Sequence, residues 1–167
     1  MARTSRDWER RVADLWASIA AHRDEDFQAR IEALAAELPA DSAVAAFERA
    51  ASFDSTGRSD LAVPLYRQAL EIGLEGERRR RAVIQLASSL RNTGGAAESV
   101  ALLTAEREAG SDELDDAVDA FLALALADTG REREAVSLAL AALAPHLPRY
   151  QRSLANYAHQ LADRPSS

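Results

Sequence analysis

Three short segments of the sequence share one pattern, and their spacing constrains the fold more than any other feature. Thr-Gly dipeptides end at Gly57, Gly94 and Gly130, at intervals of 37 and 36 residues, and a polar segment follows each of them. On both sides, apolar residues recur at spacings of three and four, which is typical of amphipathic helices. Glycine favours the left-handed conformation that ends many helices. The pattern therefore predicts a helix-turn-helix unit that is repeated three times.

The composition agrees with a chain that is helical almost throughout. Apolar residues make up 47% of the sequence but aromatic residues only 5%, so the excess lies in alanine and leucine, which favour helices. We expect an all-α fold. Helices are expected at residues 6–22, 25–37, 41–56, 60–73, 77–93, 96–109, 112–129, 132–144 and 147–163.

We expect these helices to form one domain that spans residues 1–167. Stacked helix-turn-helix units form a right-handed superhelix, or α-solenoid, and need capping helices at their ends. The expected parts are an N-terminal helical pair (1–40), three repeats (41–75, 76–110 and 111–146) and a C-terminal capping helix (147–163).

Charge and cysteine content exclude several classes of protein. The chain has no cysteine, and its beginning, MARTSRDWERRVADLW, lacks the apolar core of a signal peptide. No later segment has the length of a membrane span, so we expect a cytoplasmic protein without a membrane partner. The net charge of −7 argues against nucleic acid, whose phosphates it would repel. A nucleic-acid contact would depend on one basic run, residues 78–81.

No group of residues indicates catalysis or a metal site. His22, His146 and His159 are scattered and lack the paired spacing of zinc ligands. The acidic stretch from Asp112 to Asp119 lacks the glycine and final glutamate of a calcium loop, and suits the positive end of a helix dipole. Neither a phosphate-binding loop nor a nucleophile elbow occurs. We expect no enzyme activity, no metal and no cofactor.

The repeats resemble the tetratricopeptide repeat family, whose period is about 34 residues. The first repeat matches the family pattern of small and large residues well, and the next two match more loosely. The matching residues are Ala50, Phe53, Gly57, Ala62, Tyr66 and Ala69, then Ala87, Leu90 and Gly94, then Ala123, Leu126, Gly130, Ala135, Ala139 and Ala142. The chain is also similar to short bacterial members of that family that carry an extra N-terminal helical segment and have no assigned role.

The resemblance implies a concave surface that is built from the first helix of each repeat and binds proteins. The residues at these positions are Phe47, Ala51, Asp54, Arg81, Ile84, Gln85, Ser88, Arg91, Asn92, Phe121, Leu124 and Asp128. Arg81, Gln85, Ser88 and Asn92 fall on one stripe of a helix and could hold an extended peptide or a carboxylate. The alternative is that this stripe is only a solvated helix face.

The run Arg78-Arg79-Arg80-Arg81 is interpreted as a solvated helix start. Arginine opposes the dipole at a helix N-terminus, so the run also invites an acidic partner, which could lie within the chain. The leading function is a non-catalytic scaffold that binds a peptide or helix of a protein partner, which can be acidic. The alternative is a self-associating structural protein whose groove is filled by its own helix or by a second subunit.

Apolar stripes at both ends of the chain predict a homodimer, because a repeat array leaves an apolar face at each end unless a cap covers it. We expect the N-terminal stripe to contribute slightly more than the C-terminal one. The stripes consist of Trp8, Val12, Leu15, Trp16 and Ile19, and of Leu147, Tyr150, Leu154, Tyr157 and Leu161.

Overall fold

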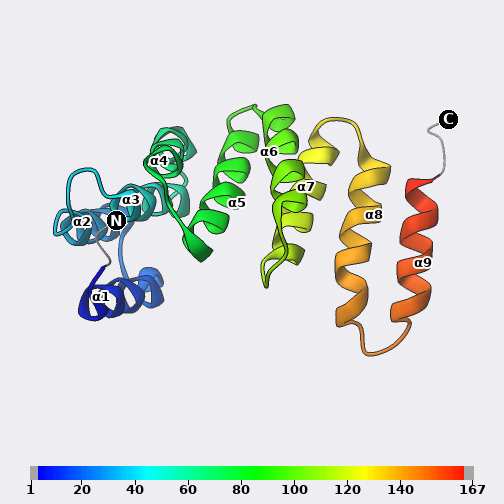
Figure 1. The fold of residues 1–167 in the computed structure, drawn as a ribbon, viewed down its shortest axis with the longest axis horizontal. Helices are drawn as coiled ribbons and strands as arrows, with labels where there is room; N and C mark the ends of the chain where they lie inside the picture. Colours follow the sequence, from blue (N-terminus) through cyan, green and yellow to red (C-terminus); the bar gives the residue numbers. More distant parts are fainter. Residues whose placement is uncertain (1–3, 164–167) are drawn as a thin grey trace. The chain divides into compact units, whose positions relative to one another are not determined.

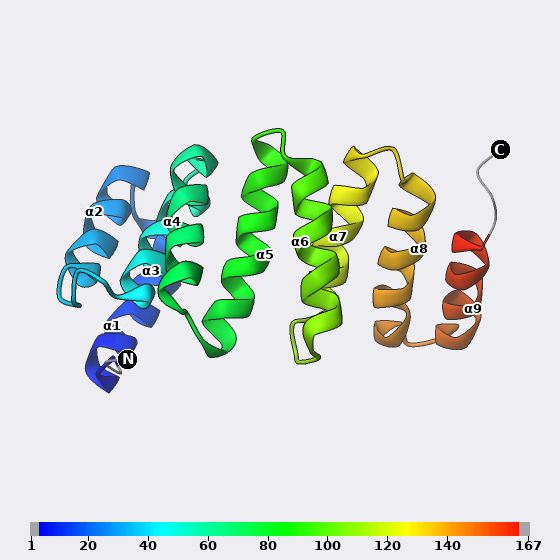
Figure 2. The same cartoon turned by 45° about the horizontal axis from the view of Figure 1, so that its top comes forward.

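The computed structural model describes residues 4–163, and within them the chain is helical without any β-strand. The fold is an all-α helical repeat, as the sequence predicts. The chain divides into two compact units, residues 1–85 and 86–167. The boundary falls within one long helix, so a single helix contributes residues to both units. The expectation of one domain stays a prediction. Figures 1 and 2 show the helices of both units.

The N-terminal unit consists of successive helices that pack on one another, and of the beginning of a further helix. Its second helix packs on the third, and the third packs on the fourth. Its elements are α1 (Arg6–Ala17), the 3₁₀ helix η1 (Ile19–Ala21), α2 (Asp24–Ala35), α3 (Ala43–Ser55), α4 (Ser59–Ile72) and the first part of α5 (Gly76–Asn92).

In the C-terminal unit, successive helices pack on one another in the order of the chain. Thus α6 packs on α7, α7 on α8, and α8 on α9, and the last two lie side by side in Figures 1 and 2. The elements are the end of α5, α6 (Ala96–Ala109), α7 (Asp115–Asp128), α8 (Glu132–Leu143), the 3₁₀ helix η2 (Ala144–His146) and α9 (Gln151–Ala162).

The three Thr-Gly turns have the conformation that the sequence predicts. Gly57, Gly94 and Gly130 have φ angles of 77°, 92° and 77°, in the left-handed region. After each glycine, the next backbone N–H donates to a carbonyl five residues earlier, as in the bond from Arg58 to Phe53 (2.8 Å). This hydrogen bond satisfies a carbonyl that the helix end would leave unpaired.

Two helices begin three or four residues later than the sequence analysis predicts. The helix expected from residue 112 begins at Asp115, because the Asp112 carboxylate accepts a hydrogen bond from the Leu114 N–H (2.7 Å) and holds the segment in a turn. The helix expected from residue 147 begins at Gln151. Leu147 precedes Pro148 and is extended, with ψ of 142°, as residues before proline usually are.

Each unit has its own apolar core. Phe27, Ile31, Phe47 and Tyr66 are fully buried in the N-terminal unit, as are Leu103 and Val118 in the C-terminal unit. Small residues occupy the helix contacts between the large side chains. Fully buried alanines include Ala50, Ala62, Ala69, Ala125 and Ala158. Of the helices within residues 4–163, none combines the length and the apolar character needed to cross a bilayer.

Candidate functional site

The residues predicted to line the binding surface differ in exposure between the two units. In the N-terminal unit, Phe47 is fully buried, Ala51 is 1% exposed and Ile84 is also buried. Asp54, Arg81 and Gln85 are half-buried. Phe47 was expected to face a ligand, but in this structure its ring belongs to the core. A helix face with so few exposed side chains offers a partner little surface.

Aromatic and charged side chains cover this face of α3. The guanidinium of Arg81 lies over the Phe47 ring, 5.4 Å from its centroid, and the Tyr66 ring lies 6.1 Å away. The Tyr66 hydroxyl donates to Asp54 (3.4 Å), and burial raises the pKa of Tyr66, so it remains a donor. Three of the predicted surface residues are therefore used to pack α3 against its neighbours.

A buried carboxylate on α3 links the α3 face to α1 and α5. Glu48 is 3% exposed and accepts hydrogen bonds from Trp16 Nε1 (2.8 Å) and Arg78 Nε (3.0 Å). The other two nitrogens of Arg78 donate to the Glu9 carboxylate at 3.0 and 2.7 Å. Arg78 also lies over the Trp8 ring, 5.9 Å from its centroid. One guanidinium therefore bridges α1 and α3.

This cluster corrects the interpretation of the arginine run as a solvated helix start. Arg78 is only 24% exposed at its side chain, and Arg80 is buried. The acidic partners expected for the arginine run lie within the chain, because Glu9 and Glu48 pair with Arg78. Buried charges are stable only when they are paired, which explains why these residues come together.

In the C-terminal unit, two of the predicted surface residues form an ion pair. Arg91 near the end of α5 donates through NH1 to Asp128 Oδ2 at the end of α7 (2.8 Å). Both side chains keep access to solvent, at 26% and 44% exposure. The Arg91 Nε is buried and has no hydrogen-bond partner. Nearby on α5, Ser88 is half-buried and Asn92 is exposed.

The middle of α7 presents apolar surface beside this ion pair. Leu124 is 47% exposed, and Phe121 is half-buried. Phe121, Leu124 and Asp128 fall at i, i+3 and i+7, so they share one side of the helix. We refer to Phe121, Leu124, Asp128 and Arg91 together as the α7 face. It combines an apolar centre with one cation and one anion.

The N-terminal stripe of apolar residues is partly buried within its own unit. Trp8 and Val12 of α1 and Phe27 and Ile31 of α2 are all buried within the chain. The Trp8 indole N–H donates to the Leu34 carbonyl (2.8 Å), and Trp16 packs edge-on against Phe27. The other three residues of the stripe are half-buried. The preference for the N-terminal segment as a dimer site stays a prediction.

The sequence analysis missed the part played by Glu48 and Trp16. Glu48 is the only acid in the segment AVAAFERAA, where alanines surround it. A charged residue at such a position is rarely buried unless it is paired, so this pattern could have predicted a paired carboxylate. Nothing in the spacing of residues 9, 48 and 78 could have identified its partners.

A comparison with known families agrees with this geometry. A family model described as "Tetratrico peptide repeat" matches residues 43–161. The matched range begins at α3 and reaches α9, and leaves out α1 and α2. No curated protein and no solved structure matches the chain.

Proposed function

Because the chain belongs to the tetratricopeptide repeat family, whose members are generally scaffolds for protein–protein interactions, we propose that it is a non-catalytic scaffold for a partner protein. The bound element is a peptide or a helix that lies on the α7 face. The observation that carries this proposal is the exposure of Leu124 beside the ion pair of Arg91 and Asp128.

The chemistry of the α7 face suits a segment with one apolar anchor and flanking polar groups. An apolar side chain would cover Leu124 and pack against Phe121, which removes apolar surface from water. The ion pair could exchange partners, since Arg91 can donate to a carboxylate and Asp128 can accept from a cation or an amide. Charged groups at a rim select the partner and its orientation more than they add affinity.

A specific observation favours the alternative function in the other unit. Side chains from α1 and α5 already cover the face of α3, through Trp16, Arg78 and Arg81. This part of the predicted groove would be filled by the chain itself. Self-occupation of the α3 face and partner binding on the α7 face are compatible, because they use different helices.

Selection from a random peptide display library on the immobilised full chain tests the proposal. The Kd of a selected peptide is then measured by fluorescence anisotropy for the unchanged chain, for Leu124→Gln and for Arg91→Ala. We expect both substitutions to weaken binding about tenfold or more, as truncation of a central contact does.

The matched control is Ile72→Gln on α4, because Ile72 is also an exposed apolar residue but lies outside the α7 face. Its Kd should equal that of the unchanged chain. Failure to select any peptide, or equal losses for Leu124→Gln and Ile72→Gln, would contradict the proposal.

A further inference from the structure

A second apolar surface lies at the other side of the C-terminal unit, on α8 and α9. Four of the six large apolar side chains that are exposed among residues 4–163 belong to these helices or to the residue before α9. They are Val136 (47%), Leu143 (48%), Tyr150 (75%) and Tyr157 (66%), and we refer to them as the outer face. None of them belongs to the α7 face.

The packing of α8 on α9 places Val136, Leu143 and Tyr157 on one side of the helix pair. The Ser137 hydroxyl donates to the Ala158 carbonyl (2.6 Å), which marks the line of contact. On one side of that line, Leu138 and Ala141 of α8 and His159 of α9 line a cavity of about 320 Å³. With 3.6 residues per turn, Val136, Leu143 and Tyr157 point roughly opposite to these cavity residues, and Tyr150 directly precedes α9. The outer face is therefore continuous across both helices.

Half-buried leucines extend the apolar surface of the outer face. Half-buried Leu140, Leu154 and Leu161 add to the four exposed side chains. A fully buried tyrosine covers about 150–250 Å², so the two tyrosines alone could bury about 300 Å². A stable interface buries about 800 Å² on each partner. The outer face can supply the apolar centre of such an interface. The polar residues at its margin can supply the remaining buried area.

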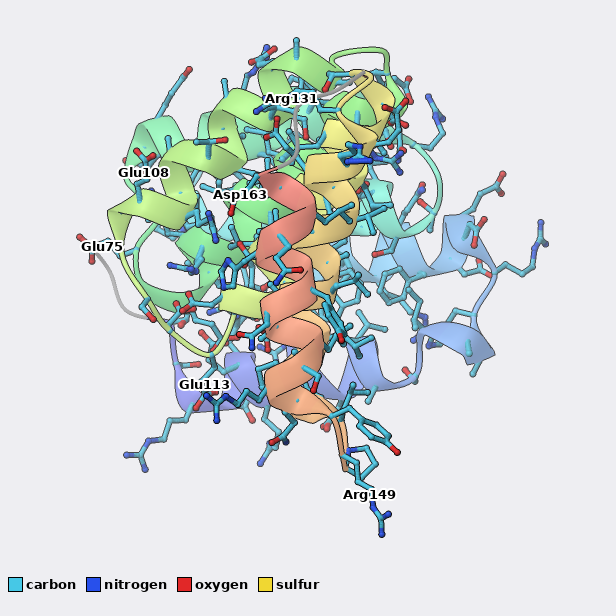
Figure 3. All side chains as sticks on the ribbon, turned by 90° about the vertical axis from the view of Figure 1, so that its right-hand side faces the viewer. Glu75, Glu108, Glu113, Arg131, Arg149 and Asp163 are labelled. Carbon is cyan, nitrogen blue, oxygen red and sulfur yellow. The ribbon has the colours of Figure 1, made fainter. Side chains whose placement is uncertain are left out.

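The charges at the margin indicate what covers the outer face. Glu132 at the start of α8 is exposed and lies on the same side of the helix as Val136 and Leu143. Because α8 and α9 are antiparallel, the loop before α9 lies at the opposite end of the face, where Arg149 is exposed. Figure 3 shows Asp163 and Arg149 at opposite ends of α9. One end of the face thus carries an acid and the other a base.

We propose that the outer face binds the outer face of a second copy of this chain, in a twofold dimer with α8 antiparallel to α8 of the other copy. A twofold interface uses the same patch on both copies, so the patch must be complementary to itself. Val136 and Leu143 are about equally exposed and lie seven residues apart, with Ala139 between them. An antiparallel crossing near Ala139 brings each Val136 opposite the other copy's Leu143, and the small alanine permits close approach.

The same arrangement brings opposite charges together at both margins. Glu132 lies about 11 Å from the crossing point along α8, at a rise of about 1.5 Å per residue. The other copy presents the loop that carries Arg149 at that distance on the opposite side. Each acidic end therefore meets a basic end, whereas a parallel arrangement would place like charges together. This orientation does not depend on whether the α7 face binds a peptide.

Sedimentation equilibrium of the full chain tests the dimer. We expect the unchanged chain to be dimeric at tens of micromolar, and Tyr157→Ser and Leu143→Gln each to weaken association about tenfold or more. Both side chains are largely exposed, so the helical circular dichroism should not change. Leu124→Gln is the matched control and should leave the dimer intact while it weakens peptide binding.

Charge reversal tests the orientation. Glu132→Arg and Arg149→Glu should each weaken association about threefold or more, because each creates two like-charge contacts, and the double variant should restore it. A monomer at all concentrations would overturn the proposal, as would equal association of Tyr157→Ser, Leu124→Gln and the unchanged chain. Loss of association in both single reversals without recovery in the double variant would overturn the antiparallel orientation.

Discussion

Ala51 and Leu124 occupy the same place in two repeats, six residues before the glycine that follows the helix. Ala51 is 1% exposed, whereas Leu124 is 47% exposed. The two turns are alike, since Gly57 and Gly130 have the same φ angle of 77°. The repeat therefore fixes the backbone of the turn but does not decide whether the face of the first helix is available to a partner.

What covers the face of α3 comes from elsewhere in the N-terminal unit. Glu48 on α3 accepts from Trp16 of α1 and from Arg78 of α5, and Arg81 lies over Phe47. The position equivalent to Glu48 on α7 is Phe121, which cannot hold an arginine by an ion pair. This one position of the repeat therefore distinguishes the two faces. The face of α3 is covered by side chains of its own unit, whereas the α7 face stays exposed.

The largest effect is expected from Glu48→Ala. The substitution leaves the Trp16 N–H and part of the Arg78 charge buried without a partner, which costs about 3–5 kcal/mol when a buried ion pair is broken. Urea denaturation measures the change in the free energy of unfolding. Glu108→Ala, at an exposed position on α6, is the control and should change it by less than about 0.5 kcal/mol. Similar losses in the free energy of unfolding for the two variants would show that Glu48 does not stabilise the contacts that cover the face of α3.

A smaller effect is expected at the paired positions themselves. Ala51→Leu adds volume to a packed site and should lower the free energy of unfolding by about 1–3 kcal/mol. Leu124→Ala removes an exposed side chain and should change it by less than about 0.5 kcal/mol. Both values come from urea denaturation. If Ala51→Leu changed the free energy of unfolding as little as Leu124→Ala, this would contradict the claim that position 51 is tightly packed and position 124 is exposed.

The smallest effect concerns pH. The hydrogen bond from Arg78 lowers the pKa of Glu9. A carboxylate with a lowered pKa stabilises the fold above its unfolded pKa of about 4.3, and this stability is lost as the pH falls through the lower folded value. The unchanged chain should therefore lose more stability between neutral pH and pH about 3 than Glu9→Gln does, by less than about 1 kcal/mol. Thermal denaturation at several pH values measures this difference, and parallel curves for the two chains would contradict it.

The sequence predicts the helical repeat well because its signals are local. The glycines that end the first helices, the small residues at helix contacts and the spacing of apolar residues all act within a few turns of the chain. The late start of α9 could also have been predicted, since Pro148 restricts Leu147 to an extended conformation.

The coverage of the α3 face could not be predicted in the same way. It depends on Glu9, Glu48 and Arg78, which are far apart in the sequence and meet only in the folded unit. The exposure of Leu124 likewise depends on tertiary packing, because it is set by which other helices cover this residue. Position in the repeat predicted which residues share a face, and tertiary contacts decided which of them are accessible.

The accessibility of the two equivalent positions, 51 and 124, can be compared by chemical labelling. The chain has no cysteine, so Ala51→Cys and Leu124→Cys each introduce a single thiol that a maleimide can label. Labelling rates are measured for each folded chain and again in denaturant, where both thiols should react equally fast. We predict that the thiol at position 124 reacts at close to its denatured rate, while the thiol at position 51 is strongly protected. Equal rates in the folded chains would contradict the account.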